Sequence, residues 1–123
     1  MRPLPGSADE IRGLVPPALE AWEFTRDNVL RGGLVDPELK ELCFRFLADG
    51  TEATDVERFE GRERAALEWA RAIAWDSSLA DDGLWERLHD LFDDHELVEL
   101  GCAIGFELGQ QHWRRTVGLP ARD

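Results

Sequence analysis

The chain has 123 residues, 43% of them hydrophobic, which is typical of one globular domain with a core of its own. Its 26 acidic residues outnumber 14 basic ones, which gives a net charge of −12. Because like charges repel, we do not expect nucleic acid or anionic membranes as partners. No stretch is apolar for long enough to cross a bilayer, and the first ten residues lack the apolar core of a secretory signal. We therefore expect a cytoplasmic protein that forms a single domain over residues 1–123.

Every regular segment has the period of a helix, and no alternating β pattern occurs. Ser7 with Glu10 and Asp93 with Glu96 have the spacing of capping boxes, which open helices. Gly118 is placed to end the last helix. The expected helices are a short one from Ser7 and then, in chain order, segments of about 17–30, 37–49, 62–75, 82–92 and 94–117.

Apolar residues recur on one side of most of these helices, which predicts a common core. Residues 51–61 are acidic and only weakly periodic, so we expect a loop there with at most one helical turn. The fold class is all-α, a compact bundle of five or six helices. The expected core contacts are Leu19, Trp22, Val29, Leu39, Leu42, Cys43, Phe46, Leu47, Ala66, Trp69, Ala70, Ile73, Leu84, Trp85, Leu88, Leu91 and Phe92.

The last helix carries glycines four residues apart at Gly101, Gly105 and Gly109. This spacing puts them on one stripe of the helix. Glycine costs about 1 kcal/mol against alanine inside a helix, so the stripe predicts that another backbone packs closely against it. Because the helix is apolar around its circumference, we expect it to be buried in the core or against a partner subunit.

Two blocks of sequence resemble a known family. The first comprises residues 17–22 (PALEAW) and 31–42 (RGGLVDPELKEL), and the second comprises 63–67 (ERAAL), 84–88 (LWERL) and 96–100 (ELVEL). In this order they resemble the carboxymuconolactone decarboxylase and alkylhydroperoxidase-like family. The resemblance implies a small all-α fold that assembles into homo-oligomers through long helices, and enzymes that are peroxidases or decarboxylases.

The chain departs from the pattern of the peroxidases in that family, which is E-x11-C-x2-C-x3-H. Glu41 stands where the glutamate belongs, but the positions due for the cysteines and the histidine hold Ala53, Val56 and Glu60. The expected loop 51–61 takes the place of the helix that carries the cysteine pair. A thiol peroxidase needs a thiolate of low pKa with a resolving partner in reach, so peroxidase activity by the family mechanism is not expected. The lactone decarboxylases lack the pair as well.

Glu41 and His112 are the candidate catalytic residues. Glu41 lies on the side of its helix away from the apolar stripe, and is either a solvated residue paired with Arg45 or a general base in a cleft. His112 follows the glycine stripe, so its ring should point inward or across an interface. It either hydrogen-bonds within the core or acts as an acid or base near neutral pH.

Four neighbouring polar residues of the last helix are the candidate ligand-binding residues: Glu107, Gln110, Gln111 and Arg114. Arg114 offers a fork of donors and Gln110 a neutral donor, which suits a small anionic or carbonyl ligand. A polar flank without a ligand is the alternative interpretation.

The two cysteines, Cys43 and Cys102, lie far apart and form no CxxC. We expect two reduced, buried thiols. His89 and His95 have the positions of surface residues, and no two histidines have the spacing of metal ligands. With no HExxH and no cluster of cysteine and histidine, the sequence predicts neither a metal nor a cofactor.

Three functional hypotheses follow. The first is a homo-oligomer that lacks thiol chemistry and binds a small molecule or a partner, associating through its last helix. The second is an enzyme of the decarboxylase or lactone type that uses Glu41 and His112 as acid and base. The third is a residual peroxidase that uses Cys43 or Cys102.

Overall fold

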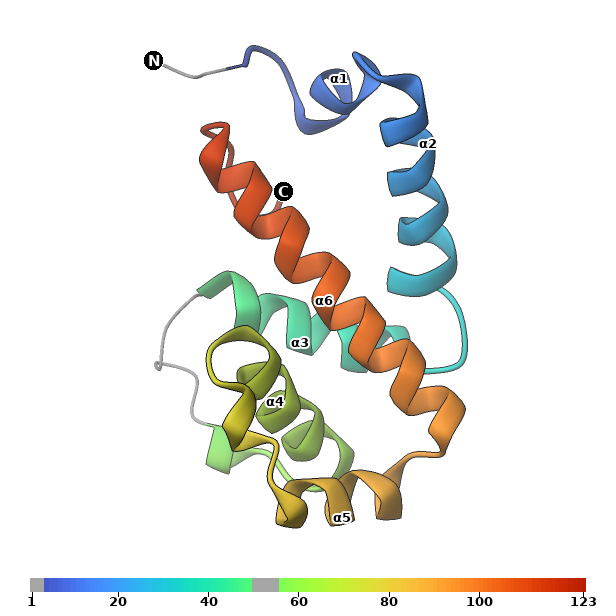
Figure 1. Cartoon of the computed structure of the whole chain (residues 1–123), viewed down its shortest axis with the longest axis vertical. Helices are drawn as coiled ribbons and strands as arrows, with labels where there is room; N and C mark the ends of the chain where they lie inside the picture. The colour runs from blue at the N-terminus through green and yellow to red at the C-terminus, as the bar shows by residue number, and fades with distance from the viewer. Residues whose placement is uncertain (1–3, 50–55) are drawn as a thin grey trace.

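The computed structural model of the chain describes residues 4–49 and 56–123. Every regular element in these two ranges is helical, which confirms the predicted all-α bundle ending in a long helix (Figure 1). The helices are α1 (Ala8–Gly13), α2 (Pro16–Thr25), η1 (Arg26–Leu30), α3 (Pro37–Asp49), η2 (Val56–Arg58), α4 (Gly61–Ala74), η3 (Ser77–Leu79), α5 (Asp82–Leu91) and α6 (Asp94–Thr116).

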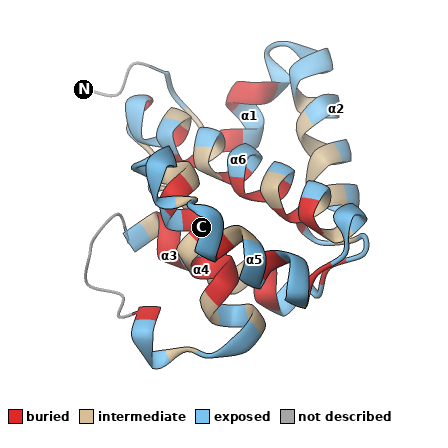
Figure 2. Ribbon diagram, turned by 60° about the horizontal axis from the view of Figure 1, so that its bottom comes forward, coloured by how far each residue is buried: buried red, intermediate tan, exposed pale blue. Residues whose placement is uncertain are grey.

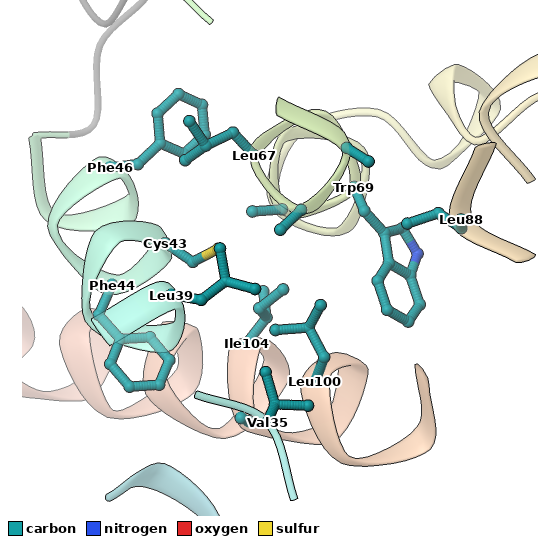
Figure 3. Packing of buried hydrophobic residues seen from close by; sticks show 14 of the residues in the cluster. Val35, Leu39, Cys43, Phe44, Phe46, Leu67, Trp69, Leu88, Leu100 and Ile104 are labelled. Carbon is teal, nitrogen blue, oxygen red and sulfur yellow. The ribbon is translucent and has the colours of Figure 1, made fainter. Parts of the chain in front are cut away.

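The core lies where α3, α4 and α6 meet. The α3 helix packs against α4 and α6, α4 also packs against α5 and α6, and the long α6 crosses the molecule diagonally (Figure 1). Leu100 and Ile104 of α6 meet Cys43 of α3 in this core, close to Leu67 and Trp69 of α4 (Figure 3). All but Trp69, which is 9% exposed, are sealed from solvent.

Side chains and prolines set the helix boundaries as the sequence predicts. Ser7 with Glu10 and Asp93 with Glu96 form complete capping boxes. The side chain of Asp81 accepts a hydrogen bond from the backbone N–H of Leu84 and opens α5. The predicted second helix is divided, because its last turn, η1, has the wider π-helical form.

A buried ion pair fixes the connection between η1 and α3. Lys40 of α3 donates to the carbonyl oxygens of Val29 and Gly32, each at 2.7 Å, and its Nζ lies 3.1 Å from Glu99 Oε1 of α6. The other oxygen of Glu99 accepts from the backbone N–H of Leu34 and of Val35. This network attaches the connection to the N-terminal part of α6.

The α1–α2 pair forms an arm beside this core. Its α2 helix contacts mainly α1 and η1, and none of its residues is buried, so the ribbon carries only intermediate and exposed colours (Figure 2). Large apolar side chains lie open at the end of α1 and along α2, among them Leu14, Val15 and Phe24, which are 57–72% exposed.

The predicted burial of α6 is correct for one side of the helix only. Gly101 faces the core, where an added Cβ would lie 2.8 Å from the Trp69 ring. Gly105 and Gly109 face away from it, and a Cβ added at either would meet no described residue within 4 Å apart from the adjacent backbone of its own helix. Phe106 is also half exposed. The core covers one stripe of the helix, and in residues 4–49 and 56–123 nothing covers the opposite stripe at Gly105 and Gly109.

Part of the predicted loop 51–61 lies outside the described residues, namely 51–55. Its remainder contains a single helical turn, Val56–Arg58, before α4 begins at Gly61. No helix in the described ranges is long and apolar enough to pass through a membrane.

Candidate functional site: a groove at Arg12 and a carboxylate cluster at Glu41

An open groove separates the α1–α2 arm from α6. Its volume is about 460 Å³, within the range of pockets that bind small molecules. No acidic residue lines it, although acids outnumber bases in the chain. The lining residues are Ile11, Arg12, Val15, Ala18, Ala21, Trp22, Thr25, Phe106, Gln110 and Trp113.

Arg12 is the charged residue in the wall of this groove. Its guanidinium carbon lies 4.1 Å from the centre of the Trp22 ring and 5.0 Å from that of Trp113, so the cation contacts the π-systems of two elements. The residue is 7% exposed. Trp22 projects from α2 and Trp113 from α6, and Arg12 thereby connects the arm to the long helix.

The hydrogen bonds of Arg12 leave part of its donor capacity free. Nε and Nη2 donate to Gln110 Oε1 at 3.3 and 2.8 Å, and Nη1 donates to Asp9 Oδ1 at 2.8 Å. A guanidinium has five N–H groups, so about two remain for another acceptor. Burial lowers the pKa of Arg12, because removal from water disfavours the charged form. The ion pair with Asp9 offsets part of that cost, and a further anion bound here would offset more of it.

Glu41 forms its ion pair with Arg122. The two side chains make a bidentate contact, with Nη1 2.6 Å from Oε1 and Nη2 2.8 Å from Oε2. The direct ion pair of Glu41 is therefore with a residue 81 positions away, whereas Arg45, the partner in one alternative, acts on Glu41 through its charge. The hydrogen bonds from Arg122 lower the pKa of Glu41 and favour its ionised form.

Glu107 and Gln111 lie deeper in the same region, between α6 and α3. Gln111 Nε2 donates to the Phe44 carbonyl at 3.0 Å and lies 3.4 Å from Glu107 Oε2. Burial raises the pKa of Glu107, although the charge of nearby Arg122 opposes this effect. We call Glu41, Phe44, Glu107, Gln111 and Arg122 the carboxylate cluster.

The predicted site residues fall into three places: the carboxylate cluster, the groove and, for His112, the exposed surface of α6. Glu41, Glu107 and Gln111 come together in the carboxylate cluster, and Arg114 beside them holds the segment after α6, donating to the Pro120 carbonyl and to Asp123 at 2.7 Å each. Gln110 belongs instead to the groove, on another side of α6.

His112 does not point inward, as one alternative expected, but is exposed on α6. Neither a hydrogen bond nor an ion pair joins it to Glu41 in the part of the chain that the structure describes. A histidine three residues after Gly109 turns outward because the buried stripe of α6 runs through Gln111 and Arg114.

The two thiols occupy different environments. Cys43 is fully buried, and desolvation raises its pKa to about 12, so it is protonated at neutral pH. Cys102 is exposed, which corrects the prediction of two buried thiols, and both cysteines are free. Their helices pack together, but Cys43 of α3 faces the core whereas Cys102 lies on the exposed side of α6.

Sequence reasoning missed Arg12 and Arg122. Arg12 reaches Gln110 across 98 positions, and Arg122 reaches Glu41 across 81, so no local spacing reports either contact. The available signal for Arg12 was indirect, since it lies beside Ile11 on the buried side of the short capped helix α1.

Comparison of the chain with models of protein families, with curated proteins and with solved structures found no match. In residues 4–49 and 56–123, no group of three or more His, Cys, Asp or Glu side chains is arranged to hold a metal ion. The assignment of function therefore depends on the geometry of the groove and of the carboxylate cluster.

Proposed function

We propose that the chain is a small-molecule-binding protein of the alkylhydroperoxidase-like type that does not use thiol chemistry. Its ligand has an apolar body and one anionic group, such as an aromatic carboxylate. The observation that carries the proposal is Arg12, a buried cation with unused donors and, among the described residues, the one charged residue in the wall of a mainly apolar groove.

The chemistry of the groove supports this class of ligand. Trp22, Phe106 and the apolar residues of α1 and α2 provide faces for a hydrophobic or aromatic body. The free N–H groups of Arg12 match the two oxygens of a carboxylate, and Gln110 holds the guanidinium in place. A neutral ligand of the same shape would leave these donors without an acceptor.

The open stripe of α6 supports a second part of the proposal, that the chain forms a homo-oligomer. Val98, Cys102, Gly105, Gly109 and His112 are all exposed and lie on one stripe, which we call the open α6 face. The described residues give no packing reason for Gly105 or Gly109, since a Cβ added at either position would meet none of them within 4 Å outside its own stretch of helix. A second copy of α6 packed closely here would supply one.

A titration with 2-naphthoate tests the ligand proposal, with quenching of tryptophan fluorescence as the signal. We expect saturable binding with a dissociation constant of about 10 μM to 1 mM, and about tenfold or more weaker binding of neutral 2-naphthalenemethanol. Ala18→Trp places a large side chain in the groove from exposed α2 and should abolish binding.

Glu20→Trp is the matched control, because Glu20 is also exposed on α2 but does not line the groove. It should bind 2-naphthoate as the unmodified chain does. Equal binding by the two tryptophan variants, or equal affinity for the acid and the neutral alcohol, would contradict the proposal.

A further inference from the structure

The carboxylate cluster holds a guanidinium group that the chain itself supplies. Arg122 presents its two terminal nitrogens to the two oxygens of Glu41, at 2.6 and 2.8 Å. Its guanidinium carbon lies 5.9 Å from the centre of the Phe44 ring. This is the geometry by which a binding site recognises a planar cation, with a carboxylate fork and an aromatic face.

The segment that carries Arg122 has no regular secondary structure and follows α6 directly. Gly118 has a φ of +83°, which turns the chain back along the helix that it has just left (Figure 1). Arg114 holds the segment through the Pro120 carbonyl and Asp123. In the described residues, the contact of this segment with Glu41 on α3 is made by the Arg122 side chain.

The groups around this guanidinium offer more acceptor capacity than Arg122 uses. Glu107 is buried nearby, and its hydrogen-bond partner is the amide of Gln111 rather than a cation. Gln111 is completely buried, and its Oε1 is the buried side-chain polar atom that lacks a hydrogen-bond partner in the described part of the chain. An unpaired buried acceptor destabilises the folded chain, and a ligand with further donors would satisfy it.

We propose that the carboxylate cluster is a binding site for a small molecule that carries a guanidinium group, and that Arg122 occupies this site while the ligand is absent. Glu41 grips the planar cation, Phe44 contacts its face, and Glu107 with Gln111 accept from the donors that reach deeper. Binding displaces Arg122 and releases the segment from α3. The groove at Arg12 is a separate site of opposite charge preference, so this proposal does not depend on it.

Chemical rescue of Arg122→Ala tests the proposal. The probe is methylguanidinium chloride at millimolar concentration, and the readout is the midpoint of thermal unfolding, with sodium chloride at equal ionic strength as the reference. We expect methylguanidinium to raise the midpoint of Arg122→Ala by about 2–4 °C over sodium. The unmodified chain should gain less than half of that, because Arg122 competes for Glu41.

The double variant Arg122→Ala with Glu41→Gln removes the fork and should lose the gain entirely. Arg122→Lys, which keeps a cation in the segment, should show a smaller gain than Arg122→Ala. The affinity for 2-naphthoate should be unchanged in all three variants. A failure of the guanidinium-site proposal is therefore distinguishable from a failure of the proposal that the groove binds an anionic ligand. A gain in Arg122→Ala no larger than with sodium, or an equal gain in the double variant, would overturn the proposal.

Discussion

Cys43 is a thiol whose surroundings suppress its reactivity. It is fully buried among α3, α4 and α6, and its pKa is raised to about 12. At pH 8 about one molecule in ten thousand would carry the thiolate, which is the reactive form. Residual peroxidase chemistry at this position is therefore not expected.

We predict that Cys43 reacts with a thiol reagent such as DTNB at least about a hundredfold more slowly in the folded chain than in denaturant. The measurement uses Cys102→Ser, so that every reacting thiol is Cys43. Similar rates in the two conditions would show that the thiol is accessible and would revive the peroxidase hypothesis.

The charge of Arg122 lowers the pKa of both Glu41 and Glu107, but the stronger burial of Glu107 raises its pKa overall. The two residues therefore affect stability with opposite dependence on pH. Folding raises the pKa of Glu107. Its contribution to stability is therefore present at pH values below its pKa in the unfolded chain, and it is lost as the pH rises through its pKa in the folded chain. The folded pKa of Glu41 is lowered, so its contribution is present above the unfolded pKa and is lost as the pH falls.

Urea unfolding at a series of pH values from acidic to neutral checks this prediction. Relative to the unmodified chain, Glu107→Gln should become more stable as the pH rises, whereas Glu41→Gln should become less stable. The charged groups that face Glu107 are Arg122, Glu41 and Arg114, and all are unchanged in its variant. Parallel curves for the two variants would contradict the assigned environments.

At the residue scale, the sequence was informative where the contacts are local. The polar residues of α6 were identified as a group, and three of them do gather near Glu41. The partner of Glu41 and the position of Arg12 depend on how α1 and the segment after α6 fold against other elements. Lys40, the single lysine, likewise gave no local sign that it binds Glu99 across 59 positions.

At the scale of the elements, the connection between η1 and α3 depends on one glycine. Gly33 has a φ of +97°, and a Cβ added there would lie 1.5 Å from Glu99 Oε1. Any side chain must therefore displace the carboxylate that pairs with Lys40. The connection and the buried ion pair form one unit.

We predict that Gly33→Ala lowers the free energy of unfolding by about 2–4 kcal/mol, through backbone strain and loss of the Glu99 contacts. Gly83→Ala is the control, because an added Cβ in α5 meets only Asp81 Oδ1, at 3.6 Å. It should leave the stability unchanged or raise it by up to about 1 kcal/mol. Chemical denaturation of both variants provides the comparison.

The elements themselves were the most predictable part of this chain. Capping boxes, prolines and glycines act within four residues, and the boundaries that they predicted agree with the structure. The glycine stripe of α6 was predicted less well, since spacing alone does not reveal which side of a helix the core will cover. The π-helical turn of η1 had no sequence signal.

At the scale of the whole molecule, an acidic chain leaves an uncharged stripe open on its longest helix. The open α6 face contributes no acid to a chain of net charge −12, so close approach of two copies there avoids the strongest repulsion. The exposed apolar residues Val98 and Phe106 lie on or beside it. Covering this face would complete the burial of α6.

We predict that the chain sediments as an oligomer and that Gly105→Glu weakens association by about tenfold or more, since it adds a like charge and bulk to the contact. Ser77→Glu, exposed on η3, adds the same charge elsewhere and should associate normally. Analytical ultracentrifugation over a range of concentrations measures both. A monomer at every concentration would exclude the oligomer.

The central claim is that the groove between the arm and α6 binds an apolar anion at Arg12, and an NMR titration with 2-naphthoate tests it most directly. Arg12, Trp22 and Trp113 line the groove, and their signals are Arg12 Nε–H and the two indole N–H groups, whereas Trp69 of α4 and Trp85 of α5 pack against each other away from it. We predict saturable shifts of the first three signals and fixed signals for Trp69 and Trp85. Unchanged Arg12, Trp22 and Trp113 signals at millimolar 2-naphthoate would contradict the claim.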